Sequence, residues 1–212
     1  MIIYGAGGHA RVIISCLLAN HQPIQAIFDD DLTKSQILDL PIQGAYHTSS
    51  FPDEELVIAI GNNVVRQSLS QKISHSFGTI CHPSAMVEKD ASIAPGTVVL
   101  HGAIIQSGCI IGKHVIINTA AQIDHDCTIA NFAHIAPGVI LCGNVSVGEN
   151  TLIGAGSIVV PNIHIGKNCM VAAGSVVTKD MRDGQMVRGN PARIIKTKIW
   201  HSPIKFGYPL HT

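Results

Sequence analysis

The sequence of 212 residues is poor in the side chains that mark several common classes of protein. Phe, Trp and Tyr make up only 4% of it, which excludes a core built on large aromatic side chains. Lys and Arg (14) balance Asp and Glu (14) without forming a run, so nothing favours binding to nucleic acid or to an anionic membrane. With no signal peptide and no long apolar span in the sequence, we expect a cytoplasmic protein.

The six cysteines are scattered, and no two of them form a Cys-x-x-Cys pair. We interpret them as reduced residues that fill the core. The chain is instead rich in aliphatic residues, which suggests many short, regular strands.

Residues 1–80 alternate between strand and helix patterns. Buried strands are predicted in MIIYGAG, PIQAIFDD and ELVIAIG, and helices in HARVIISCLLAN and NNVVRQSLSQKIS. This alternation predicts a small parallel sheet with helices on its faces. We therefore expect a small α/β domain over residues 1–80, a half-Rossmann-like βαβαβ unit.

From residue 87 onward, an aliphatic residue recurs at every sixth position. The sixteen positions are Val87, Ile93, Val99, Ile105, Ile111, Ile117, Ile123, Ile129, Ile135, Leu141, Val147, Ile153, Val159, Ile165, Val171 and Val177. The fourth residue after each is usually small, as in Ala91, Thr97 and Ala103. A chain that turns a corner every six residues needs this spacing, which is the hexapeptide signature of a parallel β-helix. With three faces per coil, residues eighteen apart stack, and about five coils are expected over residues 81–180.

The segment 181–212 is expected to form a C-terminal cap and tail, because the open ends of solenoids need caps. VRGNPARII is predicted to cover the end of the β-helix, with loops marked by Gly184, Gly189 and Pro191. The final stretch, WHSPIKFGYPLHT, is too short and too rich in proline to fold alone, and we assign it no role.

The segment YGAGGHA reads G-x-G-x-x-A between a predicted strand and a predicted helix, and Asp29 and Asp30 end the next strand. Such glycines let the backbone approach a phosphate at a helix N-terminus, while the acidic residue binds a ribose hydroxyl. Half of a dinucleotide fold suits a mononucleotide or the nucleotide end of an activated sugar better than NAD. Asn62 and Asn63 follow the third strand, where ligands of α/β sheets bind. A tight turn without a ligand is the alternative.

The stretch AQIDHDCTIANFAHIAPG places His125 between Asp124 and Asp126, at a corner of the predicted solenoid. A neutral histidine with a carboxylate on its far nitrogen suits a general base. A solvated polar turn is the alternative from spacing alone, because hexad corners are naturally polar.

Together, these motifs resemble the bacterial nucleotide-sugar N-acetyltransferases, which act on UDP-, GDP- or dTDP-linked amino sugars and include the bacillosamine and perosamine enzymes. Sialic acid O-acetyltransferases are their relatives. The segments that carry the resemblance are YGAGGHA, FDD, AIGNNVVR, INTAAQIDHDCTIANFAHIAPG, LCGNVSVGENTLIGAGSIVVPN and GNPAR. The resemblance implies a left-handed β-helix and a homotrimer with active sites between subunits. It also implies acetyl-CoA in the groove between solenoids, a nucleotide-linked amino sugar on the N-terminal domain, and no metal.

The resemblance implies roles for single residues. His125 matches the general base and Asp126 its carboxylate partner; that partner is often Glu in the family, so Asp124 is an alternative. The implied acetyl-CoA contacts are His134, Gly143, Ala155 and Ala173. The implied nucleotide-sugar contacts are Gly7, Gly8, His9, Asp29, Asp30, Gly61 and Asn62, with Asn118 beside the acetyl group.

We therefore expect an acetyl-CoA-dependent transferase that acetylates the amino group of a nucleotide-linked sugar, with His125 as its base. The backbone N–H of Gly143 is a candidate oxyanion donor because it lies eighteen residues on and so one coil above. Cys127 occupies an inward small position, so no acyl-enzyme is expected. The alternative activity is O-acetylation of sialic acid or another sugar.

Two other classes are weighed against an acetyltransferase. A zinc enzyme resembling the γ-class carbonic anhydrases needs converging ligands, yet no two histidines lie five residues apart. A sugar-nucleotide sensor or scaffold would bind its ligand without turnover.

Overall fold

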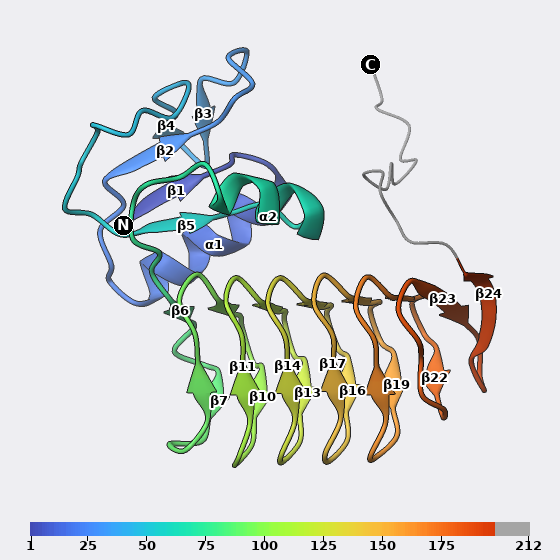
Figure 1. Cartoon of the computed structure of the whole chain (residues 1–212). Helices are drawn as coiled ribbons and strands as arrows, with labels where there is room; N and C mark the ends of the chain where they lie inside the picture. Colours follow the sequence, from blue (N-terminus) through green and yellow to red (C-terminus); the bar gives the residue numbers. More distant parts are fainter. Residues whose placement is uncertain (198–212) are drawn as a thin grey trace.

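The computed structural model describes residues 1–197. A small α/β domain lies along one side of a long solenoid of parallel strands, near its N-terminal end (Figure 1). This arrangement confirms the predicted fold class, a half-Rossmann-like domain followed by a left-handed parallel β-helix.

The α/β domain contains one three-stranded parallel sheet, in the order β2-β1-β5. Its strands are buried along their whole length, as expected for a parallel sheet that is covered on both faces. A two-stranded hairpin between β2 and β5 was not predicted, because strands of two residues show no periodicity. The elements are β1 (Ile2–Tyr4), α1 (Gly8–Ala19), β2 (Ala26–Phe28), β3 (Gln36–Ile37), β4 (Leu40–Pro41), β5 (Leu56–Ile58) and α2 (Asn63–Ser70).

The solenoid is built from strands of two residues, which form three parallel sheets. The first sheet contains β6 (Ile80–Cys81), β9 (Val98–Val99), β12 (Ile116–Ile117), β15 (His134–Ile135), β18 (Leu152–Ile153) and β21 (Met170–Val171). The second contains β7 (Met86–Val87), β10 (Ile104–Ile105), β13 (Gln122–Ile123), β16 (Ile140–Leu141), β19 (Ile158–Val159) and β22 (Val176–Val177). The third contains β8 (Ser92–Ile93), β11 (Ile110–Ile111), β14 (Thr128–Ile129), β17 (Ser146–Val147) and β20 (His164–Ile165).

We name each edge of this triangular prism by the two sheets that it joins. The turns from the first sheet to the second form the first-second edge, and those from the second to the third form the second-third edge. The α/β domain packs on the first sheet, so the second-third edge lies on the opposite side of the solenoid (Figure 1).

Strand register confirms that residues eighteen apart stack: Ile105 pairs with Ile123, and Ile123 pairs with Leu141. The solenoid makes about six turns, more than the five expected. It begins one hexad earlier than the aliphatic series, with Cys81 in the inward position. Cysteines also fill the core further along, and the six that the chain contains are all free.

The C-terminal cap continues the first sheet after the hexad spacing fails. Strand β23 (Gln185–Arg188) pairs with β21, and β24 (Arg193–Thr197) returns antiparallel beside it. Val171 pairs with Val187, sixteen residues on, so this last coil is two residues shorter than the others. The predicted terminal stretch from Trp200 lies outside the described residues.

No helix within residues 1–197 is long and apolar enough to cross a membrane.

Arg66 joins the two domains. Its buried guanidinium donates to the carbonyl oxygens of His114 (2.9 Å) and Phe132 (2.9 Å) in the solenoid. It also donates to those of Ile60 (3.0 Å) and Gly61 (3.2 Å) in the loop after β5. Burial lowers the pKa of Arg66 to about 9. Because these oxygens come from both domains, one side chain fixes the β5–α2 loop on the first sheet.

We predict that Arg66→Met destabilises the protein by at least about 3 kcal/mol, because hydrogen bonds to a charged group are lost and buried carbonyl oxygens lose their donor. Urea unfolding measures the change. Arg11→Met, which replaces an exposed arginine of α1, is the matched control and should change stability by less than about 0.5 kcal/mol. An Arg66→Met protein as stable as this control would contradict the assignment.

Candidate functional site

His125 lies on the second-third edge, in the turn between β13 and β14. Its Nδ1 is 2.9 Å from Oδ2 of Asp126. Asp124 instead accepts the backbone N–H of His125 on its Oδ1 (2.8 Å). Asp126 is therefore the carboxylate that contacts the imidazole, while Asp124 stabilises the turn.

Glycines in the neighbouring coils leave room for this pair. A Cβ at Gly143, one coil above, would lie 2.5 Å from Nε2 of His125. A Cβ at Gly108, one coil below, would lie 2.5 Å from Oδ1 of Asp126. The N–H of Gly143 makes no hydrogen bond within the described part of the chain. Gly143, whose backbone donor is free, thus lies beside the nitrogen of His125 that Asp126 does not hold.

The surroundings of His125 favour its protonated form. The hydrogen bond that the ring donates to Asp126 raises the pKa of His125, and the negative charge of Asp124 adds to the effect. A carboxylate in this position stabilises the imidazolium that forms when the histidine accepts a proton. Burial raises the pKa of the nearby Cys127 thiol to about 12, so no reactive thiolate forms beside it.

Three glycines surround an open space at the N-terminus of α1. Gly7 caps this twelve-residue helix, Gly8 begins it, and Gly61 follows β5. A Cβ on any of them would meet nothing within 4 Å, and none has a positive φ. Gly5, by contrast, has a φ of +107°, and a Cβ there would lie 2.6 Å from Cδ1 of Ile60. The fold of this chain requires Gly5 but not the other three, whose lack of a side chain fits a ligand that approaches the backbone.

The two aspartates after β2 already have partners within the chain. Asp29 accepts the backbone N–H of Ala6 (2.6 Å) and is 3.1 Å from Nζ of Lys34. Burial alone would raise the pKa of Asp29, but backbone hydrogen bonds and Lys34 lower it overall. Asp30 accepts the hydroxyl of Tyr4 (2.7 Å). Asp29 thus shapes the glycine loop, and a contact of either aspartate with a ribose stays a prediction.

Asn62 has a structural role that the sequence reading missed. Its side chain caps α2 by accepting the backbone N–H of Val65 (3.1 Å). Asparagine before a helical segment is a common N-cap signal, which could have revealed this role. Its predicted contact with the sugar nucleotide stays a prediction.

His134 lies in β15 on the first sheet and faces the α/β domain. Its Nε2 is 3.1 Å from Nδ2 of Asn118, and its Nδ1 is 3.3 Å from the carbonyl oxygen of Gly61. An amide that donates to Nε2 leaves the proton on Nδ1, so the ring is neutral. Burial lowers the pKa of His134 to about 3, with further lowering by Arg66 and His9. Both ring nitrogens have partners in the chain, so direct bonding of His134 to acetyl-CoA stays a prediction.

His9 completes this group between the domains. Its ring centroid is 6.5 Å from that of His134, and its buried Nε2 has no hydrogen-bond partner among residues 1–197. Burial, followed by the charge of Arg66, lowers the pKa of His9 to about 4. An unpartnered polar atom beside the open glycine loop is suited to bind a ligand.

Apart from the glycine loop, the two aspartates after β2 and Asn62, the predicted site residues fall into three places in one chain. His9, Gly61, Asn118 and His134 gather between the α/β domain and the first sheet. Ala155 and Ala173 lie on the first-second edge, in the turns after β18 and β21, and neither donates its backbone N–H to a described residue. His125, Asp126 and Gly143 lie on the second-third edge. The whole width of the second sheet separates these two edges.

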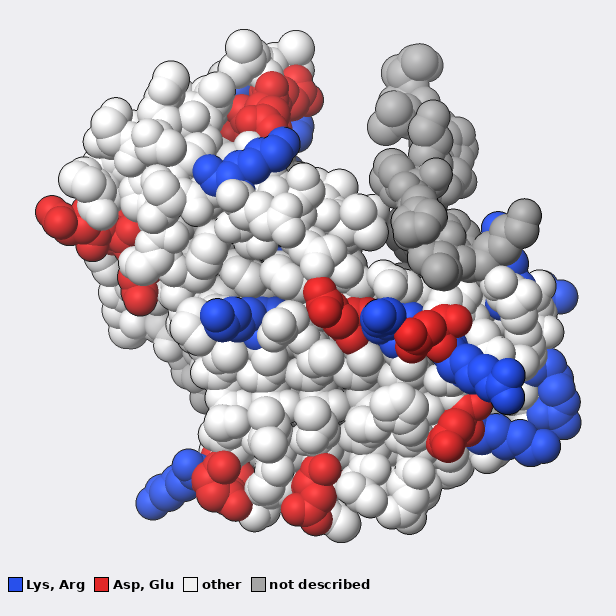
Figure 2. Space-filling view, in the orientation of Figure 1, with Lys and Arg blue, Asp and Glu red and all other residues white. Residues whose placement is uncertain are grey.

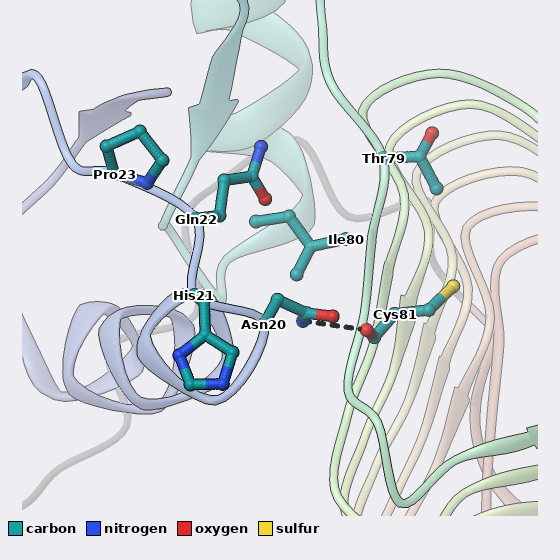
Figure 3. A pocket seen from close by; sticks show the side chains of 7 residues that line it. All are labelled: Asn20, His21, Gln22, Pro23, Thr79, Ile80 and Cys81. Atoms are coloured by element: carbon teal, nitrogen blue, oxygen red, sulfur yellow. Dashed lines mark hydrogen bonds between the residues drawn. The ribbon is translucent and has the colours of Figure 1, made fainter.

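A hollow of about 440 Å³ lies between the end of α1 and the start of the solenoid (Figure 3). Asn20 crosses it to donate to the carbonyl oxygen of Cys81 (2.9 Å). It contains none of the predicted site residues, and we interpret it as a seam between the domains. No group of three potential metal ligands occurs among residues 1–197.

Comparisons with known proteins agree with this geometry. Residues 1–73 match the PglD N-terminal domain family, and residues 144–179 match the hexapeptide repeat of succinyl-transferase. A UDP-N-acetylbacillosamine N-acetyltransferase of Bacillus subtilis is 39% identical over 107 residues. That match spans 46% of this chain and 50% of the Bacillus protein.

Solved structures match over nearly the whole chain. A variant of the perosamine N-acetyltransferase from Caulobacter crescentus, in complex with CoA and GDP-perosamine, is 36% identical with a TM-score of 0.89. The match covers 92% of this chain and 96% of that one. The acetyltransferase domain of PglB from Neisseria gonorrhoeae, in complex with acetyl coenzyme A, is 33% identical with a TM-score of 0.86, over 92% and 98% of the chains.

An α/β domain joined to a hexapeptide β-helix with a histidine–carboxylate pair on its edge defines the class of this protein. The chain belongs to the family of bacterial sugar N-acetyltransferases that includes the perosamine enzyme. This membership confirms the predicted family and enzyme class, and the CoA and acetyl-CoA bound to these relatives agree with the predicted co-substrate.

We predict that Asp126→Asn lowers the pKa of His125, because the hydrogen bond that raises it most is weakened. An NMR titration of the His125 ring measures the shift. Asp124→Asn should lower this pKa less, since Asp124 bonds to the backbone rather than to the ring. A larger effect of Asp124→Asn would instead identify Asp124 as the partner of the ring.

Proposed function

We propose that this protein transfers the acetyl group of acetyl-CoA to the amino group of a nucleotide-linked sugar, at a site shared by two subunits. The observation that carries the proposal is the His125–Asp126 pair beside the free N–H of Gly143. A relative with CoA and GDP-perosamine bound supports the two substrate classes.

The pair suits attack of an amine on a thioester. Nε2 of His125 removes a proton as the sugar amine bonds to the acetyl carbon, and Asp126 stabilises the imidazolium. The N–H of Gly143 donates to the carbonyl oxygen, which becomes negatively charged. When the carbon–sulfur bond breaks, the imidazolium returns the proton to the CoA thiolate. The products are the acetylated amine and free CoA.

The α/β domain is suited to hold the sugar nucleotide. Anions bind favourably at the N-terminus of a helix, where backbone N–H groups and the helix dipole point outward. The open space at Gly7 and Gly8 offers such a place for the diphosphate. The unpartnered Nε2 of His9 supplies another polar contact toward the first sheet.

The second sheet supplies the reason for a trimer. Its outward side chains are mostly apolar and uncovered, with Met86 60% exposed and Ile158 36% exposed. Apolar surface of this kind favours contact with another protein surface. Three copies that face a common axis with this sheet place the second-third edge of each against the first-second edge of the next. His125 of one subunit then lies beside Asn118 and Ala155 of its neighbour.

We predict that His125→Ala lowers kcat by at least about 10²-fold, because the proton acceptor is lost. Acetyl-CoA should still bind with nearly unchanged affinity. Thiol release with a panel of UDP-, dTDP- and GDP-linked amino sugars measures turnover, and calorimetry measures binding. His164→Ala, on the third sheet, is the control and should keep wild-type turnover.

Near-wild-type turnover of His125→Ala would remove His125 as the base. If the wild-type protein released thiol with sialic acid but with none of the amino sugars, its activity would be O-acetylation.

A further inference from the structure

Consecutive aspartates follow β2 at the carboxyl end of the small parallel sheet: Asp29, Asp30 and Asp31. Acidic side chains gather on the surface near this loop, with basic side chains beside them (Figure 2). Asp29 uses both of its carboxylate oxygens within the chain: Oδ2 accepts the N–H of Ala6 (2.6 Å), and Oδ1 accepts that of Asp31 (2.8 Å). Asp31 accepts the backbone N–H and the hydroxyl of Thr33 (3.1 and 2.6 Å). Both of these aspartates therefore shape the loop itself.

Asp30 differs from its two neighbours. Its Oδ1 accepts the hydroxyl of Tyr4 (2.7 Å), and its Oδ2 accepts no hydrogen bond from residues 1–197. Nζ of Lys34 lies 3.1 Å from Oδ2 of Asp29 and 3.8 Å from Oδ2 of Asp31. No cation in the described part of the chain forms an ion pair with Asp30, which is exposed. Asp30 therefore offers a carboxylate oxygen to a ligand.

Packing fixes the side chain of Tyr4 where it meets Asp30. Tyr4 ends β1, and only 7% of it is exposed. Its ring centroid lies 5.7 Å from that of Tyr46, whose own hydroxyl is 2.6 Å from Nδ1 of His75. Burial, followed by the hydrogen bond to Asp30, raises the pKa of Tyr4, so the hydroxyl keeps its proton and donates it. A fixed donor on one oxygen holds the carboxylate of Asp30 in one orientation.

This carboxylate lies at the same edge of the sheet as the glycine loop. Tyr4 pairs with Phe28 in the parallel ladder of β1 and β2, and the N–H of Gly5 donates to the carbonyl oxygen of Phe28 (2.7 Å). In open α/β sheets, an acidic residue after the second strand binds the ribose of a nucleotide whose phosphates lie at the glycine loop. Of the two aspartates expected in that role, Asp30 has the free oxygen and Asp29 does not.

We propose that Tyr4 is a positioning residue, which orients the free oxygen of Asp30 toward a ribose hydroxyl of the sugar nucleotide. This inference rests on the proposed function, which places the nucleotide at the N-terminus of α1. Without the phenol hydroxyl, Asp30 would be an exposed carboxylate that rotates freely, and binding would have to restrict it. With the hydroxyl in place, the oxygen that faces the ligand is oriented before the ligand arrives.

Calorimetry on the full chain compares UDP and GDP with their 2′-deoxy and 3′-deoxy analogues, and dTDP with its 3′-deoxy analogue. Tyr4→Phe should bind the nucleotide that wild type binds about three- to tenfold more weakly, because Asp30 loses its orientation. The loss should be much smaller for the analogue that lacks the hydroxyl bound by Asp30. A merely structural role of Tyr4 would instead weaken all analogues equally. Unchanged affinity for CoA would show that the rest of the protein is intact.

Tyr46→Phe is the matched control, because it removes a hydroxyl of the same aromatic cluster that bonds to His75 instead of a carboxylate. Its nucleotide affinity should equal that of wild type. Asp30→Ala should lose at least as much affinity as Tyr4→Phe. Adding Tyr4→Phe to Asp30→Ala should cause no further loss, since the hydroxyl then has no carboxylate to orient.

Unchanged nucleotide affinity in Tyr4→Phe, or a loss no larger than that of Tyr46→Phe, overturns the proposal. A loss that is equal for parent and analogues overturns it too, as does one that persists undiminished when Asp30 is already Ala. Each of these results leaves the proposed function standing if the wild-type protein still acetylates a nucleotide-linked amino sugar. Wild-type protein that binds none of the nucleotides would contradict the proposed function itself, and this proposal with it.

Discussion

The stacking of residues eighteen apart is the constraint on which the rest of the structure depends. It places His125 under Gly143 and Asp126 over Gly108, so the identity of each residue is tied to the coil above or below. A histidine and a carboxylate fit side by side at this corner only because the neighbouring coils carry no Cβ there. The same spacing aligns Ala155 with Ala173 along another edge.

A triangular prism cannot bring all of its edges together. The α/β domain, fixed by Arg66, covers the first sheet, whereas His125 lies on the opposite edge. In the proposed function, one chain therefore carries two incomplete halves of a site, separated by the mostly apolar second sheet. Burial of that sheet at a threefold axis would favour assembly. It would also complete the site, because each contact would join the second-third edge of one subunit to the first-second edge of the next.

The sequence predicts the solenoid well because its period is long, regular and confined to aliphatic residues. It predicts the His125–Asp126 pair because a short motif carries both residues. It does not reveal which other roles the site residues have. Asn62 caps a helix, and Asp29 accepts a backbone N–H of the glycine loop. Both side chains bind backbone groups, and such contacts leave no pattern of residue types in the sequence. Arg66 could not be identified, because its partners are carbonyl oxygens from distant segments and leave no residue pattern.

The proposed sharing of the site between the subunits of a trimer is tested most directly by mixed assemblies of two inactive variants. His125→Ala removes the base, and Gly8→Leu fills the open space at the helix N-terminus while the fold has room for the side chain. Co-expression with different tags and purification through both tags yields trimers that contain both variants. Each such trimer holds one intact site of three, so about one third of wild-type turnover is expected. Mixed assemblies as inactive as either variant alone would show that each chain builds its own site.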